Sequence, residues 1–174
     1  PGLALKSETI SLALSAELPL VVVNVQRGGP STGLPTKPEQ SDLLFAMYGR
    51  HGESPLPVVA AKSPSHAFFA AYEAARIALK YMTPVILLSD NYVATGSEPW
   101  QLPDTKTLSK LDTNIITKLN TEDGFLPFLR NVDTFARPWA LPGTPGLEYR
   151  VGGLEKEEGT GNVSYDSANH QYMT

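Results

Sequence analysis

The chain has 174 residues, 41% of them hydrophobic, which allows one well-buried core with an appendage rather than two full cores. Its net charge of -4, with scattered basic residues, argues against a nucleic-acid partner, and its lack of cysteine excludes disulfides, a thiolate nucleophile and Cys-ligated metal clusters of its own. No apolar run approaches the roughly 20 residues of a membrane-spanning helix and no secretory signal is visible, so we expect a cytoplasmic protein without a membrane partner.

Residues 7–18 place apolar side chains at four-residue spacing, which predicts a helix. Ser7 is the candidate N-cap of this helix, and Pro19 ends it. The β-branched run at 20–26 follows directly and predicts a strand that is buried on both faces. Such a strand is typical of a parallel sheet.

Residues 28–40 are rich in Gly and Pro and predict a loop. A helix is expected to begin at Pro38 and to continue through Tyr48, because proline fits the first turn of a helix. A second strand is expected at 56–61, where another short apolar run begins.

The strongest helix signal lies at 63–82, with Ser63 as N-cap, Pro64 at the first helical position and apolar residues at helical spacing. A third strand is expected at 84–88. Helices and strands thus alternate over 7–88. This alternation predicts an α/β fold with a doubly wound, mainly parallel sheet.

The regular pattern stops after Gly96, and residues 97–174 predict a long, mostly irregular segment. We therefore divide the chain into a sheet domain at 1–96 and a linker or interface segment at 97–174 that leads to a further domain outside this sequence. Trp100 and Trp139 are expected to anchor the irregular segment rather than to stack on a cofactor.

The loop after the first strand, which reads QRGGPSTGLPT over 26–36, is the candidate site because ligands of open α/β sheets bind outside the carboxyl ends of the strands. A phosphate-binding P-loop would need a lysine where Leu34 stands. The run Gly29–Gly33 matches the nucleophile elbow of α/β hydrolases, with Ser31 as nucleophile. Prolines keep the chain out of a helix until about Glu39, and the three histidines show no tie to the serine, so both alternatives rank low.

The same loop and the KPEQSDLL that follows it are very similar to the segment that lines the substrate pocket in alpha subunits of 2-oxoacid:ferredoxin oxidoreductases. Four further segments share the resemblance, which covers nearly the whole chain: PGLALKSE, YGRHGESPLPVVA, EAARIALKYMTPVILLSD and ARPWALPGTPGLEYRVGGLEKEEGTGNVSYD. Within the family the chain is most similar to the 2-oxoglutarate type. The resemblance implies part of the pyrimidine-binding domain of a thiamine-diphosphate enzyme.

By this resemblance, Arg27 and Thr36 bind the 2-oxoacid, and the hydroxyls of Ser31 and Thr32 assist. A guanidinium offers a planar fork of donors to a carboxylate, and a hydroxyl can donate without adding charge. The loop glycines are expected to let the backbone approach the ligand and to adopt conformations closed to other residues. Without the resemblance, Arg27 would be interpreted as a surface arginine and Thr36 as an ordinary loop hydroxyl.

Enzymes of this family decarboxylate a 2-oxoacid on thiamine diphosphate, pass electrons through iron–sulfur clusters to ferredoxin and form an acyl-coenzyme A. The resemblance implies a beta subunit that holds the diphosphate, Mg²⁺ and an iron–sulfur cluster, with the active site between the subunits. The family's activating glutamate is expected upstream, because this sequence begins in mid-domain by the resemblance. Glu8 is the nearest acidic candidate, but the helix dipole already explains its position in the first turn of a helix. We therefore expect part of an alpha subunit, inactive by itself and unusually apolar at its exposed edge.

Several other polar residues have simpler interpretations. Asp90 is expected to satisfy backbone groups just past a strand. Glu73 and Arg76 form a candidate ion pair on a helix surface. Arg50 and His51 either add charge near a subunit contact or belong to a solvated turn.

Overall fold

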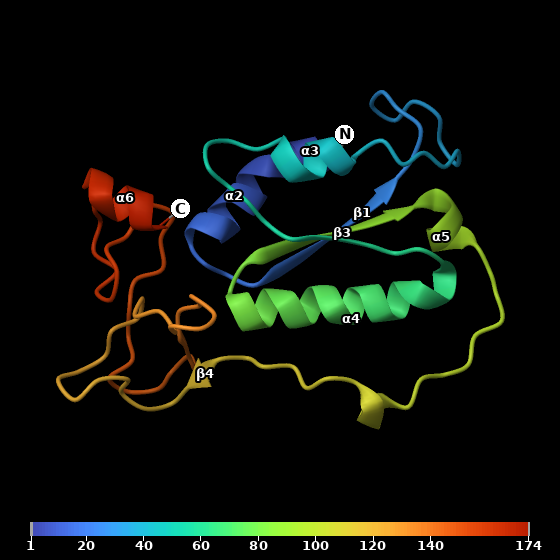
Figure 1. Ribbon diagram of the computed structural model, residues 1–174. Coiled ribbons are helices and arrows are strands. Elements are labelled where there is room, and N and C mark those ends of the chain that lie inside the picture. The colour runs from blue at the N-terminus through green and yellow to red at the C-terminus, as the bar shows by residue number, and fades with distance from the viewer. Residues whose placement is uncertain (1, 174) are drawn as a thin grey trace.

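The computed structural model describes residues 2–173 and confirms the parallel α/β fold (Figure 1). Its sheet has three strands in the order β1-β3-β2, and both pairs are parallel. Helices cover both faces, with α2 and α3 on one side and α4 on the other. The bounds of these elements are α1 Gly2–Leu5, α2 Ser7–Ser15, β1 Leu20–Gln26, α3 Leu43–Tyr48, β2 Val58–Ala60, α4 Pro64–Tyr81 and β3 Pro84–Asp90.

The core lies on the two faces of the central strand β3, which is buried along its whole length. Successive side chains of a strand point to opposite faces, so β3 contributes to two separate clusters. Val85 and Leu87 pack with the alanines of α4, while Ile86 and Leu88 pack with Leu3, Ile10 and Ala46. The small alanines allow α4 to lie close against the sheet.

Strand β1 forms an edge of the sheet, and the side chains of Val23 and Val25 on one of its faces are not covered. Val23 is 57% exposed and Val25 is 46% exposed, although both are β-branched residues of a predicted buried strand. The expectation that this strand is buried on both faces is therefore wrong for these two positions. The expectation of an apolar exposed edge is confirmed.

Helix α4 begins and ends as its sequence predicts. The side chain of Ser63 accepts a hydrogen bond from the backbone N–H of His66 at 3.3 Å, and Pro64 follows as the first helical residue. Met82 ends the helix in the left-handed conformation. On its surface, Arg76 donates to Glu73 at 2.7 Å and 2.6 Å, which confirms the predicted pair.

Two predicted helix starts are wrong. Ser7 is not a cap, because the short helix α1 precedes it and its hydroxyl donates to the carbonyl of Ala4 at 2.9 Å. Helix α3 begins at Leu43 rather than at Pro38. The reason is tertiary: the backbone N–H of Asp42 donates to the side chain of Gln26 at the end of β1, at 2.9 Å, and this bond ties the chain to the sheet directly before α3.

The remaining chain is mostly irregular, as expected, and runs along α4 before it folds beside the end of α2 (Figure 1). Trp100 packs on Phe68 at a ring distance of 5.6 Å, and the hydroxyl of Tyr72 donates to the carbonyl of Ser109, so this segment is anchored to α4. No helix within the described residues is long and apolar enough to span a membrane. The short elements of this part are α5 Asn91–Thr95, the 3-10 turn Thr105–Thr107, β4 Ile115–Ile116, β5 Trp139–Ala140 and α6 Ser167–Met173.

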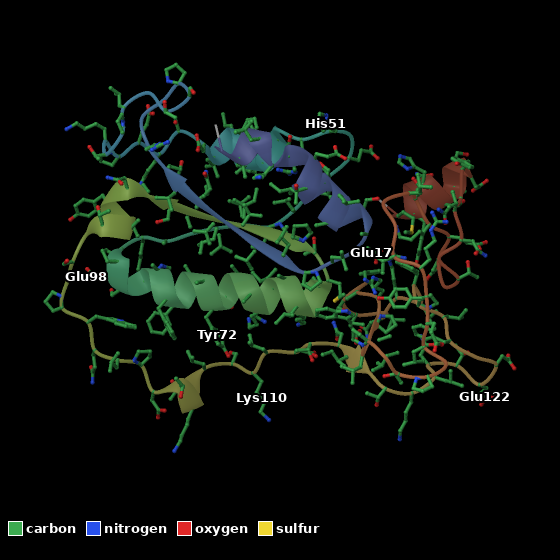
Figure 2. All side chains as sticks on the ribbon, turned by 180° about the vertical axis from the view of Figure 1, so that it is seen from behind. Glu17, His51, Tyr72, Glu98, Lys110 and Glu122 are labelled. Carbon is green, nitrogen blue, oxygen red and sulfur yellow. The ribbon has the colours of Figure 1, made fainter. Side chains whose placement is uncertain are left out.

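A cluster of charged residues joins the irregular segment to the end of α2, where Figure 2 labels Glu17. Arg130 forms an ion pair with Glu17 at 2.6 Å. Lys156, which is buried, donates to the carbonyls of Ser15, Gly152 and Leu154 at 2.7–2.9 Å. Residues 97–174 thus contact the sheet domain directly, while the domain boundary at residue 96 stays a prediction.

Candidate functional site

The candidate loop leaves the carboxyl end of β1 and lies next to α5, at the upper right of Figure 1. It closes on itself through two backbone hydrogen bonds of Gly28. The N–H of Gly28 donates to the carbonyl of Lys37 at 2.9 Å, and its carbonyl accepts from the N–H of Leu34 at 3.0 Å. The loop is therefore a closed turn rather than an open linker, and it lies at the carboxyl end of the sheet, as predicted.

The expectation that the loop glycines adopt conformations closed to other residues is wrong, whereas their approach to a ligand stays a prediction. A Cβ at Gly33 would lie 2.7 Å from the backbone carbon of Gly29, and one at Gly28 would lie 2.9 Å from Cβ of Leu34. These two glycines therefore allow the loop to pack against itself. None of the three loop glycines has a left-handed φ; that conformation belongs to Ser31, with φ 56°, and to Thr36, with φ 68°.

Arg27 is the first residue after β1, and its side chain is exposed. Within residues 2–173 its guanidinium has no hydrogen-bond or ion-pair partner. The hydroxyls of Ser31, Thr32 and Thr36 are likewise exposed and make no hydrogen bond within the described residues. One loop thus presents a free cation and three free hydroxyls, a set that can bind a carboxylate and a neighbouring carbonyl oxygen.

Polar side chains at the carboxyl end of the sheet hold both ends of this loop. The amide of Gln26 donates to the carbonyl of Ser89 at 3.0 Å. The amide of Gln40 donates to the carboxylate of Asp90 at 2.6 Å, and this bond, with a second from the N–H of Val93, lowers the pKa of Asp90. Asp90 thus caps α5 and anchors the loop, which confirms and extends its expected structural role.

Two further contacts of the loop were not anticipated from the sequence. The side-chain amide of Asn91 donates to the carbonyl of Thr36 at 2.9 Å, and the carboxylate of Glu39 accepts from the N–H of Gly29 at 3.0 Å. A signal for Asn91 was available, because it directly follows β3 and the carboxyl ends of neighbouring parallel strands converge.

The structure does not support a serine hydrolase. The elbow motif needs a helix directly after the nucleophile, whereas the chain from Gln26 to Asp42 contains none. Ser31 does have the left-handed φ of such a turn, but no histidine bonds to it among the described residues. The free hydroxyl is therefore available for binding and is not part of a triad.

A cleft of about 690 Å³ lies at the other end of the sheet. Glu8, Glu17, His51 and Lys156 are among its lining residues, and the loop from Arg27 to Thr36 does not reach it. Glu8, the nearest acidic residue to an activating glutamate by sequence, is thus remote from the loop.

Arg50 belongs to the structure of the turn after α3. Its guanidinium donates to the carbonyls of Ala46, Met47 and Ser54, and burial lowers its pKa. The donors of Arg50 therefore already bind backbone carbonyls, whereas the neighbouring His51 side chain is exposed. Among the residues that the structure describes, no three His, Asp or Glu side chains come together in a way that could hold a metal ion.

Comparison with known proteins identifies the same family along almost the entire chain. The family described as "Pyruvate flavodoxin/ferredoxin oxidoreductase, thiamine diP-bdg" matches residues 1–164. The 2-oxoglutarate oxidoreductase subunit KorA of Mycobacterium tuberculosis is 54% identical over 173 residues, which are 99% of this chain and 26% of that protein. The alpha subunit of 2-oxoacid:ferredoxin oxidoreductase 1 of Aeropyrum pernix is 32% identical over the same share of both chains, 99% and 26%.

A solved structure shows the same fold. The 2-oxoglutarate:ferredoxin oxidoreductase of Magnetococcus marinus, with 2-oxoglutarate, coenzyme A and succinyl-CoA bound, superposes with a TM-score of 0.80 at 36% identity. The match covers 99% of this chain and 29% of that one. The chain therefore spans about a quarter of the length of these relatives.

Proposed function

Because the chain belongs to the pyruvate flavodoxin/ferredoxin oxidoreductase family of thiamine-diphosphate-binding domains, we propose that it acts as part of the alpha subunit of a 2-oxoacid:ferredoxin oxidoreductase. The proposed substrate is 2-oxoglutarate, which agrees with the names of the bacterial relative and of the solved structure. The proposed reaction is oxidative decarboxylation to an acyl-coenzyme A, with the electrons passed to ferredoxin.

One structural observation supports this proposal above all. Arg27 presents a guanidinium without a partner among the described residues, on a loop that is anchored to the carboxyl end of a parallel sheet. A planar fork of donors can bind both oxygens of a carboxylate. The Thr36 hydroxyl then donates to the keto or carboxyl oxygen without adding a second charge. Ser31 and Thr32 supply further hydroxyls on the same loop.

Bound thiamine diphosphate supplies the ylid and the electron sink for the decarboxylation. In the proposed arrangement, this chain orients the 2-oxoacid, and a beta subunit holds the diphosphate, Mg²⁺ and an iron–sulfur cluster. The donor set agrees with that division of roles, because the sequence contains no cysteine and its loop offers cation and hydroxyl donors rather than metal ligands. The chain is proposed to be inactive without this partner.

The test is Arg27→Ala in the complete enzyme. Removal of one member of a buried, charge-assisted pair costs about 2–5 kcal/mol, so the specificity constant for 2-oxoglutarate should fall by roughly 30-fold to several thousand-fold. Arg27→Lys should recover only part of the loss, because a point charge cannot reproduce the fork.

Two controls make this experiment specific. Lys62→Ala removes another exposed cation, just after β2 at the same carboxyl end of the sheet but on the opposite edge strand, and should leave the specificity constant nearly unchanged. In Arg27→Ala, electron transfer from the reduced iron–sulfur clusters of the complete enzyme to ferredoxin should also stay normal. If Arg27→Ala kept a near-normal specificity constant but impaired subunit assembly, Arg27 would be structural and the proposed site would be wrong.

A further inference from the structure

Thr36 has a backbone conformation that needs external support. Its φ of 68° lies in the left-handed region, which β-branched residues strongly disfavour because Cβ crowds the backbone. A threonine in such a conformation persists only when its surroundings hold it there. The contacts of its own backbone should therefore reveal which residue provides the support.

Part of this support is local, because the N–H of Lys37 donates to the carbonyl of Leu34 at 3.2 Å and closes the turn that contains Thr36. The tertiary part of the support comes from Asn91. Its side-chain amide donates to the Thr36 carbonyl at 2.9 Å and joins segments that are 55 residues apart in the sequence. Asn91 has a fixed position because it opens α5, where the carboxylate of Asp90 accepts from the N–H of Val93 at 2.9 Å. Figure 1 shows α5 beside the loop, at the end of β3.

We propose that Asn91 is a positioning residue for substrate binding: it fixes the backbone of Thr36 and thereby the place of the Thr36 hydroxyl relative to Arg27. Asn91 acts through Thr36 and does not touch the 2-oxoacid. The inference deepens the proposed function and rests on it for its kinetic consequence. The hydrogen bond itself can be tested independently of any substrate.

The aspartate variant separates the hydrogen bond from the volume of the side chain. Asn91→Asp keeps the size and shape of the residue but replaces the donor by a carboxylate oxygen that would face the Thr36 carbonyl. Thr95→Ala is the matched control, because it removes a different side-chain hydrogen bond of the same helix, from the Thr95 hydroxyl to the Asn91 carbonyl. It leaves the contact with Thr36 in place.

In the complete enzyme, Asn91→Asp and Asn91→Ala should raise KM for 2-oxoglutarate by roughly two- to tenfold, with a smaller change in kcat. Thr95→Ala should leave KM near its original value. The decisive measurement is the double variant: in a Thr36→Ala background, Asn91→Asp should have little further effect on KM, because the hydroxyl that it positions is gone. An equal effect of Asn91→Asp in both backgrounds would overturn the proposal.

Hydrogen exchange distinguishes failure of this inference from failure of the proposed function. Asn91→Asp should speed exchange of the loop amides of Gly28, Leu34 and Lys37, which depend on the closed turn. If exchange became faster but Arg27→Ala left the specificity constant unchanged, Asn91 would remain the support of Thr36. Binding of the 2-oxoacid by this loop would then be refuted. Unchanged exchange of these amides would refute the positioning role directly.

Discussion

Two arginines at opposite ends of the sheet show how the environment decides the use of the same side chain. Arg27 follows β1 and is exposed, with no partner for its guanidinium among the described residues. Arg137 lies in the irregular segment beside the end of α2 and is 0% exposed. The first can bind a ligand, whereas most donors of the second already serve the fold.

The surroundings of Arg137 explain how a cation can be buried there. Its guanidinium lies over the rings of Phe128 and Tyr149, at 5.1 Å and 5.5 Å, and donates to the Tyr149 hydroxyl and the Pro138 carbonyl. It also reaches the Ala16 carbonyl at 3.5 Å, at the negative end of the α2 dipole. Tertiary contacts therefore take the place of water around most of this charge, while its buried Nε has no hydrogen-bond partner among the described residues.

Burial also changes the pKa of Glu17, the carboxylate in the same region. Loss of water raises the pKa of Glu17, and the nearby charges of Arg130, Arg137 and Lys156 oppose the rise. The three cations outnumber the one carboxylate of this cluster. Hydrogen bonds from Arg137 and Lys156 to backbone carbonyls help to stabilise the excess positive charge.

The largest effect that separates the two regions is expected from Arg137→Ala. Loss of the buried side chain leaves a cavity and unpaired carbonyls, so the free energy of unfolding should fall by about 2–5 kcal/mol. Urea unfolding, followed by tryptophan fluorescence from Trp100 and Trp139, measures this loss. Arg150→Ala, at an exposed position of the same segment, is the control and should stay within about 0.5 kcal/mol. If Arg27→Ala destabilised the protein as much as Arg137→Ala, the contrast between the two arginines would be wrong.

A smaller effect is expected from Thr36→Ala, and it should appear in substrate binding rather than in stability. Loss of one neutral hydrogen bond should cost about 0.5–1.5 kcal/mol of binding free energy. The specificity constant for 2-oxoglutarate should then fall by roughly two- to twelvefold. Thr36→Ser keeps the hydroxyl and should stay close to the original value in steady-state kinetics. A serine variant as impaired as the alanine variant would assign the loss to the backbone of the loop.

The smallest effect concerns the exposed ion pairs of α6, which belong to neither arginine region. His170 contacts Glu155 at 2.5 Å and Glu53 at 3.3 Å, and the hydrogen bond with Glu155, followed by its charge, raises the pKa of His170 above 6.5. A raised histidine pKa means that the contribution of the pair to stability is complete below 6.5 and is lost as pH rises through the folded-state pKa.

An NMR titration of the His170 ring can check this expectation. Its midpoint should lie above 6.5 and should move down in Glu155→Gln more than in Glu53→Gln, since Glu155 is the main cause of the shift. The docking of α6, followed by amide exchange, should weaken as pH rises through the same midpoint. A midpoint at or below 6.5, or a larger shift in Glu53→Gln, would contradict the assignment of the pair.

The sequence by itself determined those features that depend on local physics. Strand β1 and helix α4 were predicted because β-branched runs and helical spacing with a Ser-Pro start act over a few residues. The place of the candidate loop followed from the parallel pattern, since strands of such a sheet end at one edge. The roles of Arg27 and Thr36, by contrast, came from the resemblance to a family and remain proposals.

Only the tertiary structure decided the features that join distant segments. The start of α3 at Leu43 depends on Gln26, and the turn at Thr36, which is closed locally, is joined to Asn91, 55 residues away. The burial of Arg137 depends on aromatic rings and a helix end that no periodicity connects to it. A sequence pattern describes how a residue relates to its neighbours along the chain, whereas the charge and hydrogen bonds of these side chains are satisfied by groups that folding alone brings near.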